Sequence, residues 1–174
     1  MAQLVKAPQL PLLLHPTRLF LAGTTPVPGS SAPDWRALVW NAVVELPVTV
    51  IDPVRTDWGP DWTEDPDACE PFREQVQWEL RMQTTDATHV VFYFDPHKDG
   101  MVSLLELGLS LGRDRVQTVA VCCPRGYIKR GNVIMVCRQF GIPVVDTAEQ
   151  LASHKDGANS NLPYRPRDRL ERLA

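Results

Sequence analysis

The sequence has no excess of positive charge and no long apolar run. Its 18 lysines and arginines are outnumbered by 21 aspartates and glutamates, and the formal net charge is −3. Such a chain has no basic field to capture a polyanion, so we expect no nucleic-acid partner. The apolar stretch 10–14 is interrupted by Pro11 and is far shorter than the roughly 20 residues of a membrane span. No convincing signal-peptide cleavage site follows it, so we expect a cytoplasmic protein with no membrane partner.

Cysteine pairs that could bind a metal or support redox chemistry are also missing. The four cysteines form no C-x-x-C motif, and Cys122 and Cys123 lie in an apolar run, so we interpret all four as reduced core thiols. The absence of G-x-G-x-x-G and P-loop motifs gives no support to dinucleotide or nucleoside triphosphate sites of those types. His97 with its flanking acids is a weak metal signal, because a single histidine supplies too few ligands. We therefore expect no metal and no cofactor.

Short apolar runs alternate with helical patterns along the chain. Five runs predict buried strands at residues 18–23, 48–51, 89–94, 118–122 and 142–145. Helical spacing of apolar residues predicts intervening helices near residues 35–42, 72–80, 102–111 and 132–140, and a short last helix at 147–152. This alternation is typical of a parallel sheet covered on both faces. We expect an α/β fold, a flavodoxin-like or Rossmann-like three-layer sandwich whose five-stranded parallel sheet has the order 2-1-3-4-5.

A chain of this length can bury one sizeable core, and we place that domain at residues 18–152. Residues 1–17 contain three prolines and are interpreted as an N-terminal arm on the surface. Residues 153–174 form a polar C-terminal tail, either a loose extension or a docking segment for another subunit. The segment 53–70 is interpreted as an active-site loop, in which two tryptophans either stack on a ligand or pack the loop itself.

The helix expected at 102–111 carries the most informative residues. It is apolar in almost every direction except along a stripe of Ser103, Glu106 and Ser110, spaced by three and four residues. A carboxylate on a mostly buried helix must be paired, protonated or directed into a cavity, because burying an unpaired charge is costly. Ligands bind beyond the carboxyl ends of strands in such sheets, which favours a cavity in which the helix dipole keeps Glu106 ionised. The alternative is a glutamate at the rim of the sheet that forms a local salt bridge.

Four fragments occur in a distinctive order within roughly residues 18–146. They are Phe20-Leu-Ala-Gly23, Phe72-Arg-Glu-Gln-Val-Gln-Trp-Glu79, Asp86 and Ser103-x-x-Glu-Leu-Gly108. Together they resemble the nucleoside 2-deoxyribosyltransferase-like family, whose relatives include deoxynucleoside 5′-monophosphate N-glycosidases. The resemblance implies that Glu106 attacks the anomeric carbon of a nucleoside or nucleotide-like substrate, releases the base and forms a glycosyl-enzyme ester. A second base or water then resolves the ester, so transferase and hydrolase activities both remain open.

The resemblance also implies roles for residues around Glu106. Asp99 is the expected second catalytic residue, contacting the base or sugar hydroxyls, with a plain loop turn as the alternative. Glu79 is expected in the same pocket, with a solvated helix face as the alternative. Ser103 contributes to 5′-phosphate binding in phosphate-preferring relatives, although an N-cap explains it equally well. Phe20 stands where such proteins often carry a tyrosine that contacts the sugar.

The remaining substrate-binding candidates lie at strand exits: Gly23, Thr24, Asp95 and Asn132. Asn132 is also a plausible cap for the helix that follows it. Asp86 is interpreted as a structural residue that caps a strand entry. The resemblance implies a homo-oligomer in which the loops 113–115 and 127–132 complete neighbouring pockets. Two rival functions are a non-catalytic nucleotide- or metabolite-binding module and a protein-interaction domain.

Overall fold

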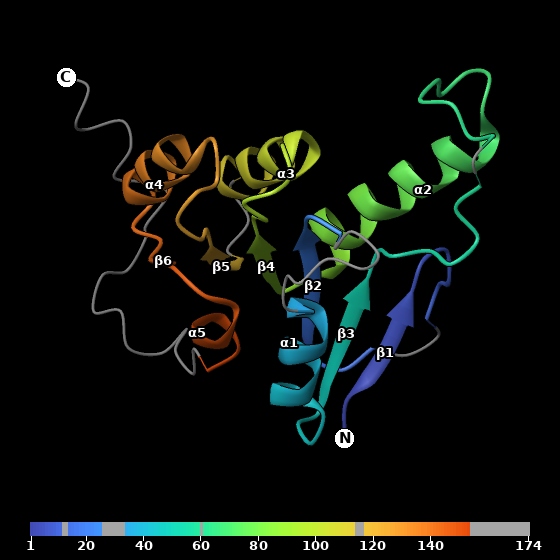
Figure 1. The fold of residues 1–174 in the computed structure, drawn as a ribbon. Helices are drawn as coiled ribbons and strands as arrows, with labels where there is room; N and C mark the ends of the chain where they lie inside the picture. The colour runs from blue at the N-terminus through green and yellow to red at the C-terminus, as the bar shows by residue number, and fades with distance from the viewer. Residues whose placement is uncertain (12–13, 26–33, 60, 114–116, 154–174) are drawn as a thin grey trace.

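Six strands among the described residues form one parallel sheet in the order β1-β3-β2-β4-β5-β6 (Figure 1). The computed structural model describes residues 1–11, 14–25, 34–59, 61–113 and 117–153. The strands are β1 (Gln3–Lys6), β2 (Thr17–Gly23), β3 (Val48–Asp52), β4 (His89–Tyr93), β5 (Thr118–Cys122) and β6 (Val144–Val145). Strands β2 to β6 have the predicted order 2-1-3-4-5, so the flavodoxin-like α/β prediction is confirmed, while the sheet has six strands instead of five.

The additional strand comes from the segment interpreted as a surface arm. β1 pairs in parallel with β3 from Gln3 opposite Thr49 to Lys6 opposite Asp52, and Val5 is buried in the core. The pairing extends past the strand, because the Ala7 amide donates to the Asp52 carbonyl at 3.2 Å. The beginning of the chain is therefore part of the sheet. Four residues are too few for the apolar pattern to distinguish a strand from a loop.

The helices form two layers, one on each face of the sheet (Figure 1). The α1 (Trp35–Val43) and α5 (Ala148–Ser153) helices cover one face, and α2 (Glu70–Arg81), α3 (Met101–Leu111) and α4 (Arg130–Gln139) cover the other. Successive side chains of a strand point to opposite faces. In β2, Leu19 and Leu21 accordingly join the core under α1, while Phe20 and Ala22 join the core under α2 and α3. The near-continuous apolar strands follow from this burial on both faces.

Helix starts position several of the polar residues. Asp34 caps α1, because its Oδ1 accepts a hydrogen bond from the Ala37 amide at 3.1 Å. The α3 helix begins after Gly100, which adopts the left-handed conformation at φ 60°, so Ser103 lies inside the first turn and does not act as an N-cap. The α4 helix begins at Arg130, so Asn132 is likewise inside the first turn and caps nothing.

The α2 helix continues into a π-helical turn, η1 (Met82–Asp86), which the sequence pattern does not predict. The Ala87 amide closes this turn by donating to the Met82 carbonyl at 2.8 Å. Asp86 ends the turn just before β4 and lies 3.6 Å from Arg81, with its backbone carbonyl bound by Arg18. These contacts agree with a structural role for Asp86.

All four cysteines are buried free thiols, as predicted. Across the described ranges, no helix is long and apolar enough to span a membrane. Residues 154–174 of the tail lie outside the described residues, as does most of the 113–115 loop.

Candidate functional site

The exits of β2 and β4 lie side by side at the centre of the carboxyl edge. Gly23 ends β2 at φ 120°, and a Cβ there would lie 2.5 Å from the Tyr93 carbonyl oxygen, so only glycine fits. The Thr24 amide donates to that carbonyl at 3.0 Å, and the Thr24 hydroxyl accepts from the Asp95 amide at 3.0 Å. The chain turns from β2 towards β3 here, while β4 lies on the other side of β2. This is the switch point where α/β sheets of this kind bind ligands.

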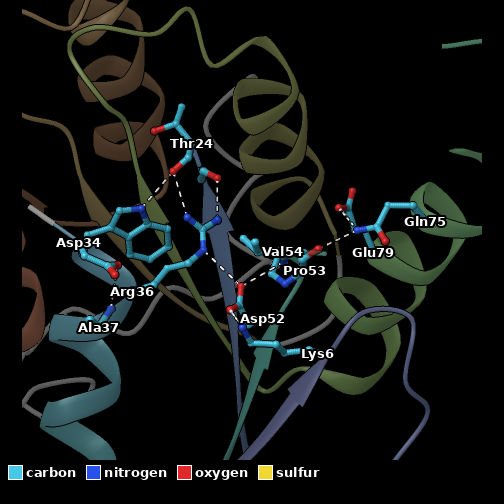
Figure 2. A network of polar contacts seen from close by, with 12 residues as sticks. Lys6, Thr24, Asp34, Arg36, Ala37, Asp52, Pro53, Val54, Gln75 and Glu79 are labelled. Carbon is cyan, nitrogen blue, oxygen red and sulfur yellow. Dashed lines mark hydrogen bonds and ion pairs between the residues drawn. The ribbon is translucent and has the colours of Figure 1, made fainter. Parts of the chain in front are cut away.

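A buried arginine joins the exits of β2 and β3 (Figure 2). Arg36 reaches from the first turn of α1 and donates through Nη1 to the Thr24 carbonyl and through Nη2 to the Gly23 carbonyl, both at 3.1 Å. Its Nε forms an ion pair with Asp52 Oδ1 at 3.3 Å. Its guanidinium also lies 4.3 Å from the centre of the Trp35 ring. Burial lowers the pKa of Arg36, and Asp52 opposes that effect, so the side chain remains a fixed cation.

Asp52 has partners on several sides. Besides Arg36, it lies 3.9 Å from Lys6 Nζ on the neighbouring β1, and its Oδ1 accepts from the Val54 amide at 3.1 Å. The sequence pattern places Asp52 directly after the strand predicted at 48–51 and offers no reason to single out Arg36. An arginine in the first turn of an amphipathic helix is normally solvated, so only its partners distinguish it.

Two polar stripes face each other between the helices on the other face. The α3 stripe consists of Ser103, Glu106 and Ser110, as the sequence predicts. The α2 stripe consists of Gln75, Glu79 and Gln83, spaced by four residues along α2 and η1. The Gln83 side-chain amide crosses between them, donating to the Ser110 hydroxyl at 2.9 Å and to the Glu106 carbonyl at 3.2 Å. The layer that covers the main core therefore contains a polar seam.

The two carboxyls of this seam influence one another. The Gln75 amide donates to Glu79 Oε1 at 2.7 Å and to the Pro53 carbonyl at 2.8 Å, which links α2 to the exit of β3 (Figure 2). Burial raises the pKa of Glu79, while the Gln75 hydrogen bond and the charge of Arg36 lower it. Burial raises the pKa of Glu106 to about 8, with a further increase from Glu79 and an opposing effect of Arg36. Glu79, Glu106 and Arg36 therefore form one electrostatic site built from three helices.

The expected ionisation of Glu106 is wrong for the protein without substrate. A pKa of about 8 leaves this carboxyl mainly protonated at neutral pH. The prediction weighed the helix dipole, whereas lost hydration and the second carboxyl outweigh it. A helix end contributes at most about 2 kcal/mol, which is less than the effect of burying a carboxyl beside another acid.

The loop before α3 brings Asp95 and Asp99 to the same edge in different environments. Asp95 is buried, and its Oδ1 accepts from the His97 amide at 2.9 Å, so this carboxylate stabilises its own turn. Asp99 is exposed, and its backbone carbonyl accepts from the Tyr127 hydroxyl at 2.6 Å. A side chain at Gly100 would lie 3.1 Å from both Thr24 and Tyr127, so the loop packs closely beside the β2 exit. Asp99 is the loop acid with a solvent-accessible side chain.

Two predicted binding residues lie away from this site. Phe20 is fully buried in the core, so no surface of its side chain is available to a substrate. Asn132 is exposed in the first turn of α4, after β5 and Tyr127. Ser103 is buried in the first turn of α3, three residues before Glu106. Within the described residues, no group of three or more His, Cys, Asp or Glu side chains could hold a metal ion.

The loop between β3 and α2 packs on itself. The rings of Trp58 and Trp62 are 4.7 Å apart, and the Arg55 guanidinium lies 4.9 Å from the centre of the Trp62 ring. Arg55 also pairs with Asp57 at 2.7 Å and with Glu74 on α2 at 3.0 Å. These contacts favour the packing interpretation for Trp62, while Trp58 keeps 51% of its surface exposed.

Comparison with known families identifies a match over most of the domain. A family model described as nucleoside 2-deoxyribosyltransferase like matches residues 16–127. The matched region begins just before β2 and includes both stripes, Arg36, Asp52 and the loop that carries Asp99. A comparison with curated proteins finds no significant match.

Proposed function

The chain belongs to the nucleoside 2-deoxyribosyltransferase-like family, and we propose that it cleaves or transfers at the N-glycosidic bond of a nucleoside or nucleotide-like substrate. Family membership suggests glycosyl transfer. The observation that supports Glu106 as the nucleophile is its perturbed carboxyl at the carboxyl edge: burial and the charge of Glu79 raise its pKa to about 8, and Arg36 opposes that rise. Perturbed carboxyls of this kind gather at reactive sites.

The pair has a chemical use. Two desolvated carboxyls whose charges act on one another titrate together, and near neutral pH they retain a proton between them. When the proton is on Glu79, the Glu106 carboxylate can attack the anomeric carbon, and Arg36 favours that ionised form. The carbon–nitrogen bond breaks, its electron pair leaves with the base, and the base takes up a proton from solvent. The carboxylate stabilises the positive charge that develops on the sugar ring before the ester forms.

Asp99 is proposed to contact the base or the sugar hydroxyls, because it is the exposed acid of the loop beside α3. Thr24 and Gly23 support the site by joining strand exits, and Asp95 supports it by shaping the loop. The second half-reaction transfers the sugar from Glu106 to another base or to water. Transfer requires a site that excludes water until the second base arrives.

A panel assay tests this proposal. The protein is incubated with ribo- and deoxyribonucleosides and their 5′-monophosphates, and free base is measured, with and without a second base. We expect base release that disappears in Glu106→Ala and persists in Glu149→Ala, a control on the exposed side of α5. Exchange of one base for another identifies a transferase, and release alone identifies a hydrolase. Binding of these compounds without base release would replace the enzyme with a nucleotide- or metabolite-binding module.

We also propose a homo-oligomer located in the cytoplasm. Large apolar side chains are exposed on α3, at Met101, Val102 and Leu105, and on α4, at Met135 and Val136. Groups of exposed apolar side chains commonly mark protein interfaces. Sedimentation velocity across micromolar concentrations checks the assembly, and a monomer throughout would refute it.

A further inference from the structure

The polar seam between α2 and α3 contains a side chain that the reaction described above does not use. Gln83 lies on the π-helical turn η1 and has no exposed surface. Its amide nitrogen donates to the Ser110 hydroxyl at 2.9 Å and to the Glu106 carbonyl at 3.2 Å. Glu106 and Ser110 are one helical turn apart, so a single amide holds both ends of the turn that carries Glu106.

On its own helix, Gln83 follows Glu79 by four residues and therefore lies on the same face, one turn further along. The hydrogen bonds of Gln83 thus connect the segment that carries one carboxyl to the turn that carries the other. The η1 turn is itself tied to the chain before β5, because the Gln117 amide donates to the Gln83 carbonyl at 2.9 Å and to the Ala87 carbonyl at 3.0 Å. The connection from η1 through the Gln83 side chain to the Glu106 turn is therefore anchored to α3 at one end and to the chain before β5 at the other.

Stability alone does not account for a glutamine at this position. Among the residues that the structure describes, the Gln83 Oε1 atom is buried without a hydrogen-bond partner. A buried carbonyl in that state lowers stability, whereas an apolar side chain of similar length would fill the space without the penalty. Single π-helical turns also occur frequently at functional sites, since they reorient side chains within a helix.

We propose that Gln83 is a positioning residue for glycosyl transfer, which holds the Glu106 turn of α3 at a set separation from Glu79. This inference rests on the function proposed above. The charged groups that act on Glu106 are Glu79 from α2 and Arg36 from α1. Without the connection, α3 can move outwards, and Glu106 then gains water and moves away from Glu79. Both changes bring the pKa of Glu106 down towards its ordinary value, and the nucleophile loses its alignment with the anomeric carbon.

The test is Gln83→Met, which keeps the length of the side chain and removes its amide. The Ser110 hydroxyl can then donate to the Glu106 carbonyl one turn earlier, so no donor is left unpaired. We expect kcat to fall by about 10²-fold, as misplacement of a reacting group by about 1 Å can cause. We expect KM to change little and the Tm to stay level or rise. The matched control is Gln77→Met at an exposed position of α2, which should change neither kcat nor Tm.

A second readout does not depend on any substrate. Carbon-13 NMR of labelled glutamate side chains follows the titration of Glu106 in the ligand-free protein, with Glu106→Gln identifying its signal. Gln83→Met should lower this pKa. If the wild-type protein turns over no compound of the panel, the proposed function fails while the titration still tests the connection. Unchanged kcat and titration, or a lower Tm as the only effect, would show that Gln83 is merely structural.

A milder variant covers the case in which Gln83→Met does not fold. Ser110→Ala removes one acceptor of the Gln83 amide and leaves the hydrogen bond to the Glu106 carbonyl. We expect the same direction of change in kcat and in the titration, smaller than for Gln83→Met. A Ser110→Ala protein whose kcat and Glu106 titration both match the wild type would overturn the inference.

Discussion

Asp52 and Glu106 are two acids at one edge of one sheet, and their surroundings are opposite. Asp52 ends β3 among partners: the guanidinium of Arg36, the ammonium of Lys6 and the amide of Val54. Glu106 is influenced by a second acid, Glu79, while Arg36, the cation that lowers its pKa, already binds Asp52 and two backbone carbonyls. One carboxylate is surrounded by compensating charge, and the other is not.

This contrast separates a structural acid from a reactive one. A buried ion pair contributes mainly through the cost of breaking it, because the remaining partner is left with an uncompensated charge. A carboxyl held beside another acid is poorly stabilised in the ground state and is therefore available for chemistry. Removing each carboxyl in turn should therefore affect different quantities: activity for Glu106 and stability for Asp52.

The largest expected effect is the loss of catalysis in Glu106→Ala. Removing the nucleophile should cost several kcal/mol of transition-state stabilisation, a fall of roughly three orders of magnitude or more in kcat/KM. The Tm should hardly change, because the substitution removes a desolvated acid and leaves no buried ion-pair partner without its counter-charge. Kinetics and calorimetry on one preparation measure both quantities. Unfolding of the variant, or turnover within about tenfold of wild type, would make Glu106 a structural residue.

Asp52→Ala should show the reverse pattern, with stability as the primary loss. The substitution leaves the buried Arg36 cation without its carboxylate, and breaking such a pair typically costs about 3–5 kcal/mol. Urea unfolding of the variant measures this value. Asp57→Ala is the matched control, since it removes an exposed partner of Arg55 and should cost far less stability than Asp52→Ala. Equal losses from the two variants would remove the distinction drawn for Asp52.

The dependence of stability on pH provides a smaller effect with a definite sign. The pKa of Glu106 is about 8 in the folded protein, above its ordinary value of 4.5, so the folded state binds more protons between these values. The contribution of this group to stability is full below pH 4.5 and is lost as the pH rises through about 8. Glu106→Gln should therefore gain stability relative to wild type at pH 9, on the order of 1–2 kcal/mol, because the partly hydrated side chain realises only part of the shift. A difference in the free energy of unfolding between Glu106→Gln and wild type that stays constant from pH 5 to pH 9 would contradict the raised pKa.

The smallest expected effect is a displacement of the pH profile in Glu79→Gln. Activity should rise with pH as Glu106 ionises, because the carboxylate is the proposed nucleophile. The charge of Glu79 raises the pKa of Glu106, so neutralising Glu79 should lower that pKa and move the rise in activity towards lower pH. Initial rates from pH 5 to pH 9 give the midpoint. Glu70→Gln, at the exposed start of the same helix, should leave the midpoint in place. A midpoint unchanged in Glu79→Gln would show that the two carboxyls act independently.

The pattern of the sequence predicts the parts of the molecule that repeat a simple rule. Strands such as β3 are buried on both faces, so their residues are apolar without alternation and are easily recognised. The α3 stripe follows from helical spacing alone, but the exposure of Met101, Val102 and Leu105 on a helix expected to be mostly buried does not. The η1 turn escapes prediction because a single π-helical turn changes the period for only five residues.

The candidate site is harder to predict because its properties depend on pairs of residues distant in sequence. Arg36 resembles any surface arginine until Asp52, 16 positions later, is placed beside it. Glu106 appears ionised when only its own helix is considered, and Glu79 and burial reverse that conclusion. The position of Phe20 in a motif predicts a substrate-binding residue. Its side chain instead points into the core, because of the face of β2 that it occupies.

The placement of β1 has a consequence for the solubility of the protein. β3 is buried along its whole length, and β1 covers the edge that it would otherwise offer to solvent. An uncovered apolar strand edge is a template for pairing with another chain, and thus for aggregation. β1 itself is four residues long, largely exposed, and soon followed by Pro8 and Pro11, which have no amide hydrogen to donate to an incoming strand. The first six residues therefore cover the edge of the sheet, and removing them would expose the apolar edge of β3 to pairing with other chains.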